Sequence, residues 1–364
     1  MKVAVITCYK YPDYGRAVVL RSVLLANANH QTIVIKNNHR GVLRYPEVII
    51  RTFMVRLRQR PDVYLLTFRG YEMLPAILLI ALGKPVILDE LVNPIEVVNE
   101  HRQLYKGTLT YRLMGLWLIL GNLYNLLLRC CRLVIADTNA HAVYSSKASG
   151  LPPERYRVIP VGADESVFKP KLKNPDQKSD VFTVLYYGTM VPLHGLSHVL
   201  TAAERLKNQQ NINFLLVGGG KKAAKQIANA SKRGANIEYL SWVETDKLPA
   251  LISEADLCLG GPFGNTLQSQ LVTTAKTYQF LACSAPVLIG RTKETEGTKL
   301  FEDKGNCLLV PQGDADAIAG AIEWAAIHPK ALNKIGIAGH QLYNQHFSNT
   351  IIGRKMASLL DELY

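Results

Sequence analysis

Short apolar runs alternate with amphipathic segments along most of this chain. In the first part the apolar, β-type runs fall at 2–7, 32–35, 63–67, 85–89, 133–137 and 156–160, and in the second part at 182–187, 213–217, 237–240, 257–259, 286–289 and 308–310. Helical patterns separate them, for example at 72–82. Apolar strands that alternate with helices are typical of a parallel sheet covered on both faces. The pattern therefore predicts an α/β fold.

One stretch interrupts this alternation. Residues 168–180, FKPKLKNPDQKSD, are rich in Lys, Pro and Asp and nearly free of apolar residues, which indicates a linker. A chain of 364 residues is also too long for one ordinary core. We therefore predict two tandem Rossmann-like, doubly wound domains at 1–165 and 166–345, and a final helix at 346–364 that packs back on the first domain. Such domains are expected to hold a ligand in a cleft between them, at the carboxyl ends of their strands.

The positive charge is concentrated in the first domain. The chain has a net charge of +13, and residues 1–165 contribute +9 of it, with 21 Lys and Arg against 12 Asp and Glu. A basic domain can face nucleic acid, anionic lipid or a phosphorylated substrate. A nucleic-acid binder is the weaker alternative, because the sequence contains no recognised basic and aromatic module. We expect no nucleic-acid partner.

Two segments suggest contact with an anionic membrane surface. Arginines spaced seven apart and apolar residues on another face define the first segment: Arg44, Arg51 and Arg58, with Ile50, Met54 and Leu57. This pattern fits either a solvated basic helix or one that touches lipid. The second segment, 113–128, is uncharged, but its 16 residues fall short of the roughly 20 that span a bilayer. It is expected to form a buried helix or one that dips into a membrane surface.

The cysteines and the amino terminus indicate the cellular compartment of the protein. The six cysteines lie mostly inside apolar runs and lack metal-ligand spacing: Cys8, Cys130, Cys131, Cys258, Cys283 and Cys307. They predict buried thiols in a reducing compartment. The first residues, MKVAVITCYKYPDYG, lack the apolar region and cleavage site of a signal peptide. We expect a cytoplasmic protein, peripheral on the cytoplasmic face of the membrane.

The segment 182–196, FTVLYYGTMVPLHGL, is the main candidate for chemistry. It predicts a strand that ends at Gly188, a short loop and the start of a helix after Gly195. The first N–H groups of a helix carry the positive end of its dipole, so this junction suits a diphosphate. His194 would add a proton-dependent charge, since its pKa would rise beside a dianion. The alternative is that His194 only caps the helix or fills space in the protein.

Several segments in order resemble one known family. YYGTMVPLHGL, LLVGGG, and FGNT with KTYQFLA are similar to the carboxyl-terminal half of retaining glycosyltransferases of the GT-B fold, in glycosyltransferase family 4. IADTNAHAVY and VIPVGADESVFKP resemble the last strand of that family's first domain and its interdomain crossover. The likeness covers about 130–310 well, and the first 110 residues only in their strand pattern.

The resemblance implies that the second domain holds a nucleoside diphosphate sugar. The implied donor-binding residues are Gly188, Thr189, Gly195, Gly218, Gly219, Trp242, Gly264, Asn265, Thr266 and Gln279. Both glutamates with which the family grips the donor are missing, and Gln279 occupies the place of the second, where its amide can still bind a ribose hydroxyl. Trp242 lies where the family holds the base, with core packing as the alternative.

The family commonly has Arg and Lys in the loop where this chain has Thr189 and His194. We therefore assign the fixed positive charge to Lys276, with an exposed helix turn as the alternative. In the first domain Asp89 ends the strand PVILDE and is expected to point into the cleft. Asp89, His194 and Lys276 are the candidate catalytic residues. Gly15, Arg16 and Arg69 also lie at strand ends and are the candidate acceptor-binding residues.

These observations predict a retaining glycosyltransferase that moves a sugar from a nucleoside diphosphate sugar to a glycan or lipid-linked acceptor. No aspartate pair of the metal-chelating kind stands at a strand end, so we expect a metal-independent enzyme with no cofactor besides its donor substrate. The resemblance implies front-face displacement without a protein nucleophile. The alternative is an inactive GT-B homologue that acts as a binding or scaffold partner of a glycan-assembly enzyme, because the family's glutamates and cations are missing.

Overall fold

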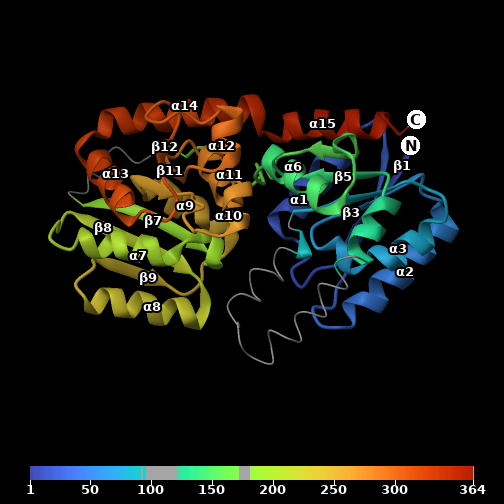
Figure 1. Ribbon diagram of the computed structural model, residues 1–364, viewed down its shortest axis with the longest axis horizontal. Helices are drawn as coiled ribbons and strands as arrows, with labels where there is room; N and C mark the ends of the chain where they lie inside the picture. The colour runs from blue at the N-terminus through green and yellow to red at the C-terminus, as the bar shows by residue number, and fades with distance from the viewer. Residues whose placement is uncertain (92, 96–120, 122, 172–180, 364) are drawn as a thin grey trace. The chain divides into compact units, whose positions relative to one another are not determined.

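The computed structural model describes residues 1–91, 93–95, 121, 123–171 and 181–363. The chain forms two compact units (Figure 1). The first unit consists of Met1–Val161 together with Asn349–Tyr364, and the second unit consists of Gly162–Ser348. The chain therefore leaves the first unit after Val161 and returns to it for its last helix.

The first unit is built on a six-stranded sheet in which all neighbouring strands are parallel. In spatial order the strands are β2 (Gln31–Lys36), β1 (Lys2–Thr7), β3 (Val63–Leu66), β4 (Val86–Asp89), β5 (Leu133–Ala136) and β6 (Tyr156–Val158). Every residue of β3, β4 and β5 is buried. Such continuous apolar strands are expected where helices cover both faces of a sheet.

Two sets of helices cover the first sheet. One face packs against α1 (Gly15–Leu25) and α15 (Asn349–Asp361), and the other against α2 (Arg44–Gln59) and α3 (Leu74–Ala81). The first unit also contains α6 (Asn139–Ser149) and the short 3-10 turns η1 (Gly70–Glu72) and η2 (Pro153–Arg155). In α15 the buried residues Ile352, Met356, Leu359 and Leu360 complete the core beside α1.

The second unit repeats the same architecture with a second parallel sheet of six strands. In spatial order they are β12 (Leu308–Val310), β11 (Val287–Gly290), β10 (Leu257–Leu259), β7 (Phe182–Gly188), β8 (Ile212–Gly218) and β9 (Ile237–Leu240). The strand order changes direction at β7, where the chain first goes to β8 and later returns to β10. Doubly wound sheets bind their ligands at such a switch point.

The helices of the second unit follow its strands. They are α7 (Leu196–Arg205), α8 (Gly220–Lys232), α9 (Leu248–Glu254), α10 (Leu267–Leu271), α11 (Ala275–Ala282), α12 (Lys293–Thr298), α13 (Ala315–Ile327) and α14 (Pro329–His346), with 3-10 turns η3 (Pro192–His194) and η4 (Thr245–Lys247). The main core of the unit forms where α7, α8 and α13 pack on one face of the sheet. Their apolar residues recur every three or four positions, as in a helix with one buried face.

The predicted fold class is confirmed, and the strands lie where the apolar runs place them, within one or two residues at their ends. The prediction of six buried thiols is wrong in part: Cys130 is exposed and Cys283 is half-buried, whereas Cys8, Cys131, Cys258 and Cys307 are buried. The run 113–120 and residue 122, and the part 172–180 of the predicted linker, lie outside the described residues. Among the helices that the structure describes, none has the length and apolar character needed to cross a bilayer.

Candidate functional site

The predicted phosphate junction lies at the carboxyl end of β7, inside the second sheet. The strand ends at Gly188, and α7 begins at Leu196 after the turn η3. Gly188 and Gly195 have φ angles of 140° and 69°, which residues with a side chain rarely adopt. No side chain caps the start of α7. The first N–H groups of this helix can therefore be offered to an anion.

A second loop, 260–266, packs directly against this junction. The N–H of Gly264 donates to the carbonyl of Leu193 at 3.1 Å. A Cβ atom at Gly195 would lie only 2.6 Å from the nitrogen of Gly264, so a side chain at Gly195 would separate the two loops. Asn265 is exposed, and the hydroxyl of Thr266 accepts from the Ser269 N–H at 3.1 Å, which caps α10. The two groups of predicted donor residues thus lie side by side.

Lys276 of α11 is buried beside these loops. Its side chain lies over the ring of Tyr186, with the Nζ atom 3.8 Å from the ring centroid. In the part of the chain that the structure describes, Nζ has no hydrogen-bond partner. Burial lowers the pKa of Lys276 well below its usual value. The alternative of an exposed helix turn is therefore wrong, because the residue is 5% exposed.

His194 also presents a buried nitrogen without a partner. Its Nδ1 atom has no hydrogen bond within the described residues, and a Cβ atom at Gly188 would lie 3.6 Å from it. Burial lowers the pKa of His194 well below 6.5, and the charge of Lys276 lowers it further. The direction is thus opposite to the rise that we expected beside a dianion. Two partnerless nitrogens close together form a site that an anion would complete.

Gln279 lies one helical turn after Lys276, so both side chains leave α11 on the same side. The hydroxyl of Tyr187 donates to Gln279 Oε1 at 2.6 Å. The ring of Tyr187 packs edge-on against Phe280 at a centroid distance of 5.0 Å. This bond uses the amide oxygen of Gln279 and leaves its NH₂ group to act as the donor toward a ligand.

Gly218 and Gly219 join β8 to α8. Gly218 pairs with Gly188 in the sheet, and a Cβ atom at Gly218 would lie 2.5 Å from the Gly188 carbonyl oxygen. These glycines therefore let two strand ends approach closely. Trp242 is 71% exposed, and its indole N–H donates to Glu244 Oε1 at 3.2 Å. The alternative of core packing for Trp242 is wrong. Thr189 is exposed at the same edge of the sheet.

In the first unit, Asp89 forms a buried ion pair with Arg16. Arg16 Nη2 lies 2.9 Å from Asp89 Oδ1, and both side chains are at most 1% exposed. Arg16 Nη1 also donates to the carbonyl of Pro160. A carboxylate buried at the end of a strand needs such a partner. The expected free carboxylate directed into a cleft is therefore not what the structure has, and Arg16 is not exposed for an acceptor.

Arg69 and Gly15 lie at the carboxyl edge of the first sheet. Gly15 begins α1 and is exposed. Arg69 has a left-handed backbone with φ 59°, an uncommon conformation for a residue with a side chain and one that often marks a functional position. Its Nη2 atom lies 2.5 Å from Glu72 Oε1. Arg69 is thus ion-paired with Glu72 at the edge where loops of the first unit meet, while 42% of its side chain is exposed.

Two tyrosines that we did not predict hold the second-unit site together. Tyr186 lies under Lys276, and Tyr187 holds Gln279. The sequence could have indicated them, because two adjacent tyrosines at the end of a buried strand each need a hydrogen-bond partner for the hydroxyl group. The neighbouring side chains of a strand point to opposite faces, so each tyrosine serves a different part of the site.

Comparisons with known proteins concern both the second unit and the whole chain. Residues 181–326 match the family described as Glycosyl transferases group 1. A segment of 170 residues is 29% identical to WcaI of Escherichia coli (strain K12), which carries a provisional name as a colanic acid biosynthesis glycosyl transferase. The match covers 46% of this chain and 40% of WcaI. The chain thus matches less than half the length of this relative.

Two solved structures share the fold over the whole chain. Anabaena HepE, in complex with UDP and glucose, has a TM-score of 0.73 at 16% identity and covers 100% of both chains. The sucrose-phosphate synthase of Thermosynechococcus elongatus has a TM-score of 0.77 at 15% identity and covers 100% of this chain and 99% of the synthase. At these identities the likeness shows the fold, which is that of GT-B glycosyltransferases.

Proposed function

We propose that this chain, whose residues 181–326 match the family described as Glycosyl transferases group 1, transfers a sugar from a nucleoside diphosphate sugar to a glycan or lipid-linked acceptor. One observation carries the proposal: the partnerless Lys276 Nζ and His194 Nδ1 lie beside the glycine loops at the carboxyl ends of the second sheet. Buried nitrogen donors without acceptors are costly and rare. A diphosphate would provide the missing acceptors.

The diphosphate would rest on three kinds of positive group. The N–H groups at the start of α7 and around Gly264 supply fixed dipoles. Lys276 would be charged once the diphosphate lies next to it, since a dianion raises its lowered pKa, and its side chain is already fixed over Tyr186. His194 would become protonated once a dianion lies next to it. The NH₂ group of Gln279 would donate to a ribose hydroxyl, with its orientation held by Tyr187.

We assign the reaction to retention of configuration without a protein nucleophile. The bond between the anomeric carbon and the diphosphate oxygen breaks, and the acceptor oxygen bonds to the same face of that carbon. The acceptor proton passes to the departing phosphate oxygen. Lys276 and the helix dipole stabilise the negative charge that develops on the leaving group. These groups take the part that a divalent metal ion takes in other transferases, so we propose metal-independent transfer.

The lipid or glycan acceptor would be reached at an anionic membrane surface through α2. This helix buries only Val48 and Thr52. Its apolar residues remain accessible: Ile50 is 62%, Phe53 50%, Met54 37% and Leu57 57% exposed. Exposed arginines on the same helix, Arg51 and Arg58, would meet anionic headgroups. An apolar surface interspersed with arginines is more costly in water than at a lipid interface. We propose on this basis that the enzyme works at the cytoplasmic face of a membrane.

The donor is tested by titrating the full chain with UDP, GDP, ADP and their glucose conjugates in the calorimeter. UDP is the first probe, because HepE was solved with it. Saturable binding of at least one nucleotide, followed by slow hydrolysis of its sugar conjugate, is expected. NMR of the released or transferred sugar should show the retained anomer, and EDTA should leave the rate unchanged. Failure of all nucleotides to bind would contradict the proposal.

A further inference from the structure

The first unit has an aromatic and cationic cluster at the carboxyl edge of its sheet that the donor site does not involve. Two loops build it, one after β1 and one after the adjacent strand β3. Phe68 stacks on Tyr14 at a centroid distance of 4.7 Å and meets the edge of Tyr9 at 5.0 Å. Tyr11 lies 6.1 Å from Tyr9 and is 49% exposed. Aromatic faces and edges of this kind suit the C–H groups of a sugar ring.

Cations surround these rings. The guanidinium carbon of Arg69 lies 5.8 Å from the centroids of both Tyr9 and Tyr71. The guanidinium of Arg40 lies 5.9 Å from Tyr11. Arginine planes stack on aromatic rings while their N–H groups remain directed outward. The cluster therefore presents both apolar faces and cationic donors to the same ligand.

The charges within the cluster do not cancel. Arg69 and Arg44 share the single carboxylate of Glu72, at 2.5 Å and 3.4 Å, and Tyr45 donates to the same carboxylate. Within the described residues, the Nε atoms of Arg69 and Arg44 are both buried and have no hydrogen-bond partner. Two guanidinium groups with one carboxylate leave an excess positive charge and two N–H groups that need an acceptor.

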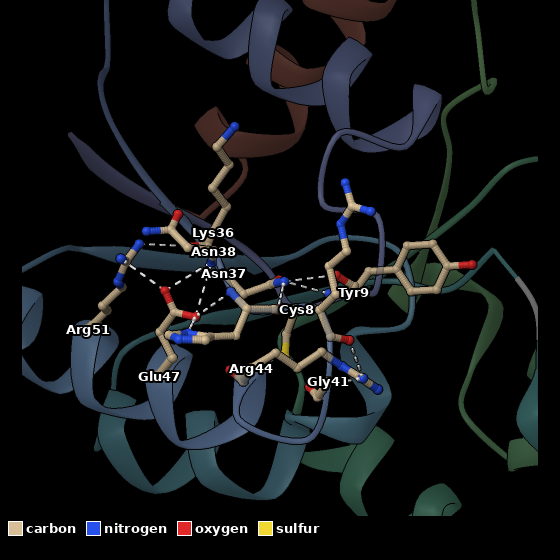
Figure 2. Close-up of polar contacts among 11 residues, drawn as sticks. Cys8, Tyr9, Lys36, Asn37, Asn38, Gly41, Arg44, Glu47 and Arg51 are labelled. Atoms are coloured by element: carbon tan, nitrogen blue, oxygen red, sulfur yellow. Dashed lines mark hydrogen bonds and ion pairs between the residues drawn. The ribbon is translucent and has the colours of Figure 1, made fainter. Parts of the chain in front are cut away.

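The backbone around the cluster is held in place by hydrogen bonds from side chains. Figure 2 shows the side chain of Asn37 next to Tyr9, where its Oδ1 atom accepts from the Tyr9 N–H at 3.0 Å and its Nδ2 atom donates to the Tyr9 carbonyl at 2.9 Å. Glu47 accepts from the N–H groups of Asn38 and His39 at 2.9 Å and 3.0 Å. The hydrogen bonds lower the pKa of Glu47 to about 2. These contacts fix the loop that carries Arg40 and leads to Arg44.

We propose that this cluster binds an anionic sugar of the acceptor, with the ring packed against Tyr9 and Tyr11 and the anionic group bound by Arg69 and Arg44. This inference rests on the proposed transferase function and gives the class of acceptor. A carboxylate and a phosphate share the required chemistry, since both accept paired hydrogen bonds from guanidinium groups. A neutral sugar would leave the two buried Nε–H groups without acceptors.

The test measures sugar binding to the full chain in the presence of saturating UDP. The probes are methyl glucuronoside for a carboxylate, glucose 1-phosphate for a phosphate, and methyl glucoside as the neutral match. At least one anionic probe should bind about ten-fold more tightly than methyl glucoside, as expected for charge-assisted hydrogen bonds. The anionic probe that binds more tightly identifies the anionic group as a carboxylate or a phosphate. Equal binding of all three would overturn the inference.

Variants separate this inference from the donor proposal. Arg69→Gln and Tyr9→Leu should each weaken the preferred anionic probe by about ten-fold, and UDP affinity should stay unchanged. Arg354→Gln, on an exposed part of α15, is the matched control and should leave both unchanged. If UDP binds and Arg69→Gln keeps full affinity for the anionic sugar, the acceptor site is elsewhere. If UDP itself does not bind, the proposed function fails instead.

Arg69→Gln could also lose binding by unfolding its loop. The variant Arg69→Lys distinguishes the two explanations, because it keeps the charge but loses the planar paired donors. Partial recovery of anionic-sugar binding by Arg69→Lys, with thermal unfolding like that of the parent, is the expected result. Equal loss in both variants with a lowered Tm would show a structural role and overturn the assignment.

Discussion

The ammonium group of Lys276 lies 3.8 Å from the centroid of the Tyr186 ring and has no hydrogen-bond acceptor in the described part of the chain. A ring face stabilises a cation by about 0.5–2 kcal/mol, whereas leaving a charged donor unsatisfied costs more than that. Burying Lys276 in this position therefore lowers the stability of the folded protein. Such a cost is common where a site is built for a ligand.

Replacing Lys276 should change protein stability and UDP affinity in opposite directions. The pKa of Lys276 is lowered in the folded protein, so the unfolded chain binds the proton more readily, and the folded state is penalised at every pH below the unfolded pKa. Lys276→Met removes this penalty and should raise the Tm of the empty protein by about 2–4 °C per kcal/mol gained. UDP affinity should fall by about ten-fold or more.

Scanning calorimetry and UDP titration check both halves of this prediction. Lys232→Met, at the exposed end of α8, is the matched control and should change neither quantity. A Lys276→Met protein that is less stable and binds UDP normally would show that the lysine is a structural residue.

Donor binding should take up protons. The pKa values of His194 and Lys276 are both lowered in the folded protein, and a diphosphate beside them would raise both. Proton uptake then occurs between the empty and bound pKa values, and UDP affinity must fall as the pH rises through that interval. Burial raises the pKa values of Tyr186 and Tyr187, so these groups do not titrate there.

The uptake is measured by titrating UDP in two buffers of different ionisation enthalpy at pH 7.5–9, where the diphosphate itself is fully ionised. The observed enthalpy should depend on the buffer, and His194→Gln should reduce that dependence. An enthalpy that is the same in both buffers would contradict a role for these two nitrogens.

Tyr187 and Gln279 should act as one unit. Tyr187→Phe removes the hydrogen bond to Gln279 Oε1, so the amide can rotate and its NH₂ group loses its fixed direction. We expect a loss of about 0.5–1.5 kcal/mol in UDP binding from this change. In a double-mutant cycle with Gln279→Ala the second substitution should add little, whereas additive losses would indicate independent contributions.

Gly195 should tolerate no side chain. Gly195→Ala places a Cβ atom 2.6 Å from the Gly264 nitrogen on a backbone with φ 69°, and both effects are unfavourable by about 1–3 kcal/mol. The matched control is Gly320→Ala in α13, where a Cβ atom meets no atom within 4 Å. Urea unfolding should show destabilisation for the first and a gain of about 0.5–1 kcal/mol for the second.

The exposed apolar residues of α2 should direct the protein to anionic vesicles. Phe53→Ser with Leu57→Ser should lower co-sedimentation with vesicles that contain phosphatidylglycerol, since each removes accessible apolar area from the interface. High salt should weaken binding of the parent protein through Arg51 and Arg58. Ile327→Ser, equally apolar and 75% exposed in the second unit, is the control. Equal binding to neutral vesicles would contradict the role of α2.

The sequence predicted the sheets well because inner strands such as β3, β4 and β5 are buried on both faces, which leaves an uninterrupted apolar run. It also located the glycine junction, since Gly188 and Gly195 occur where the backbone requires positive φ. It could not predict the pairing of Arg16 with Asp89, which are 73 positions apart. The burial of Lys276 was equally hidden, because a lysine in a helical pattern is usually exposed. The roles of the site residues in binding remain predictions.

The last helix, α15, determines how the first unit can be produced as a separate protein. Since α15 completes the core beside α1 while residues 162–348 form a separate unit, the first unit consists of two pieces of chain that are far apart in sequence. A fragment ending at Val161 would leave Val19 and Val23 without their partners Ile352 and Met356. The first unit can therefore be produced alone only as a circular permutant or by complementation, with residues 349–364 supplied as a joined or separate peptide.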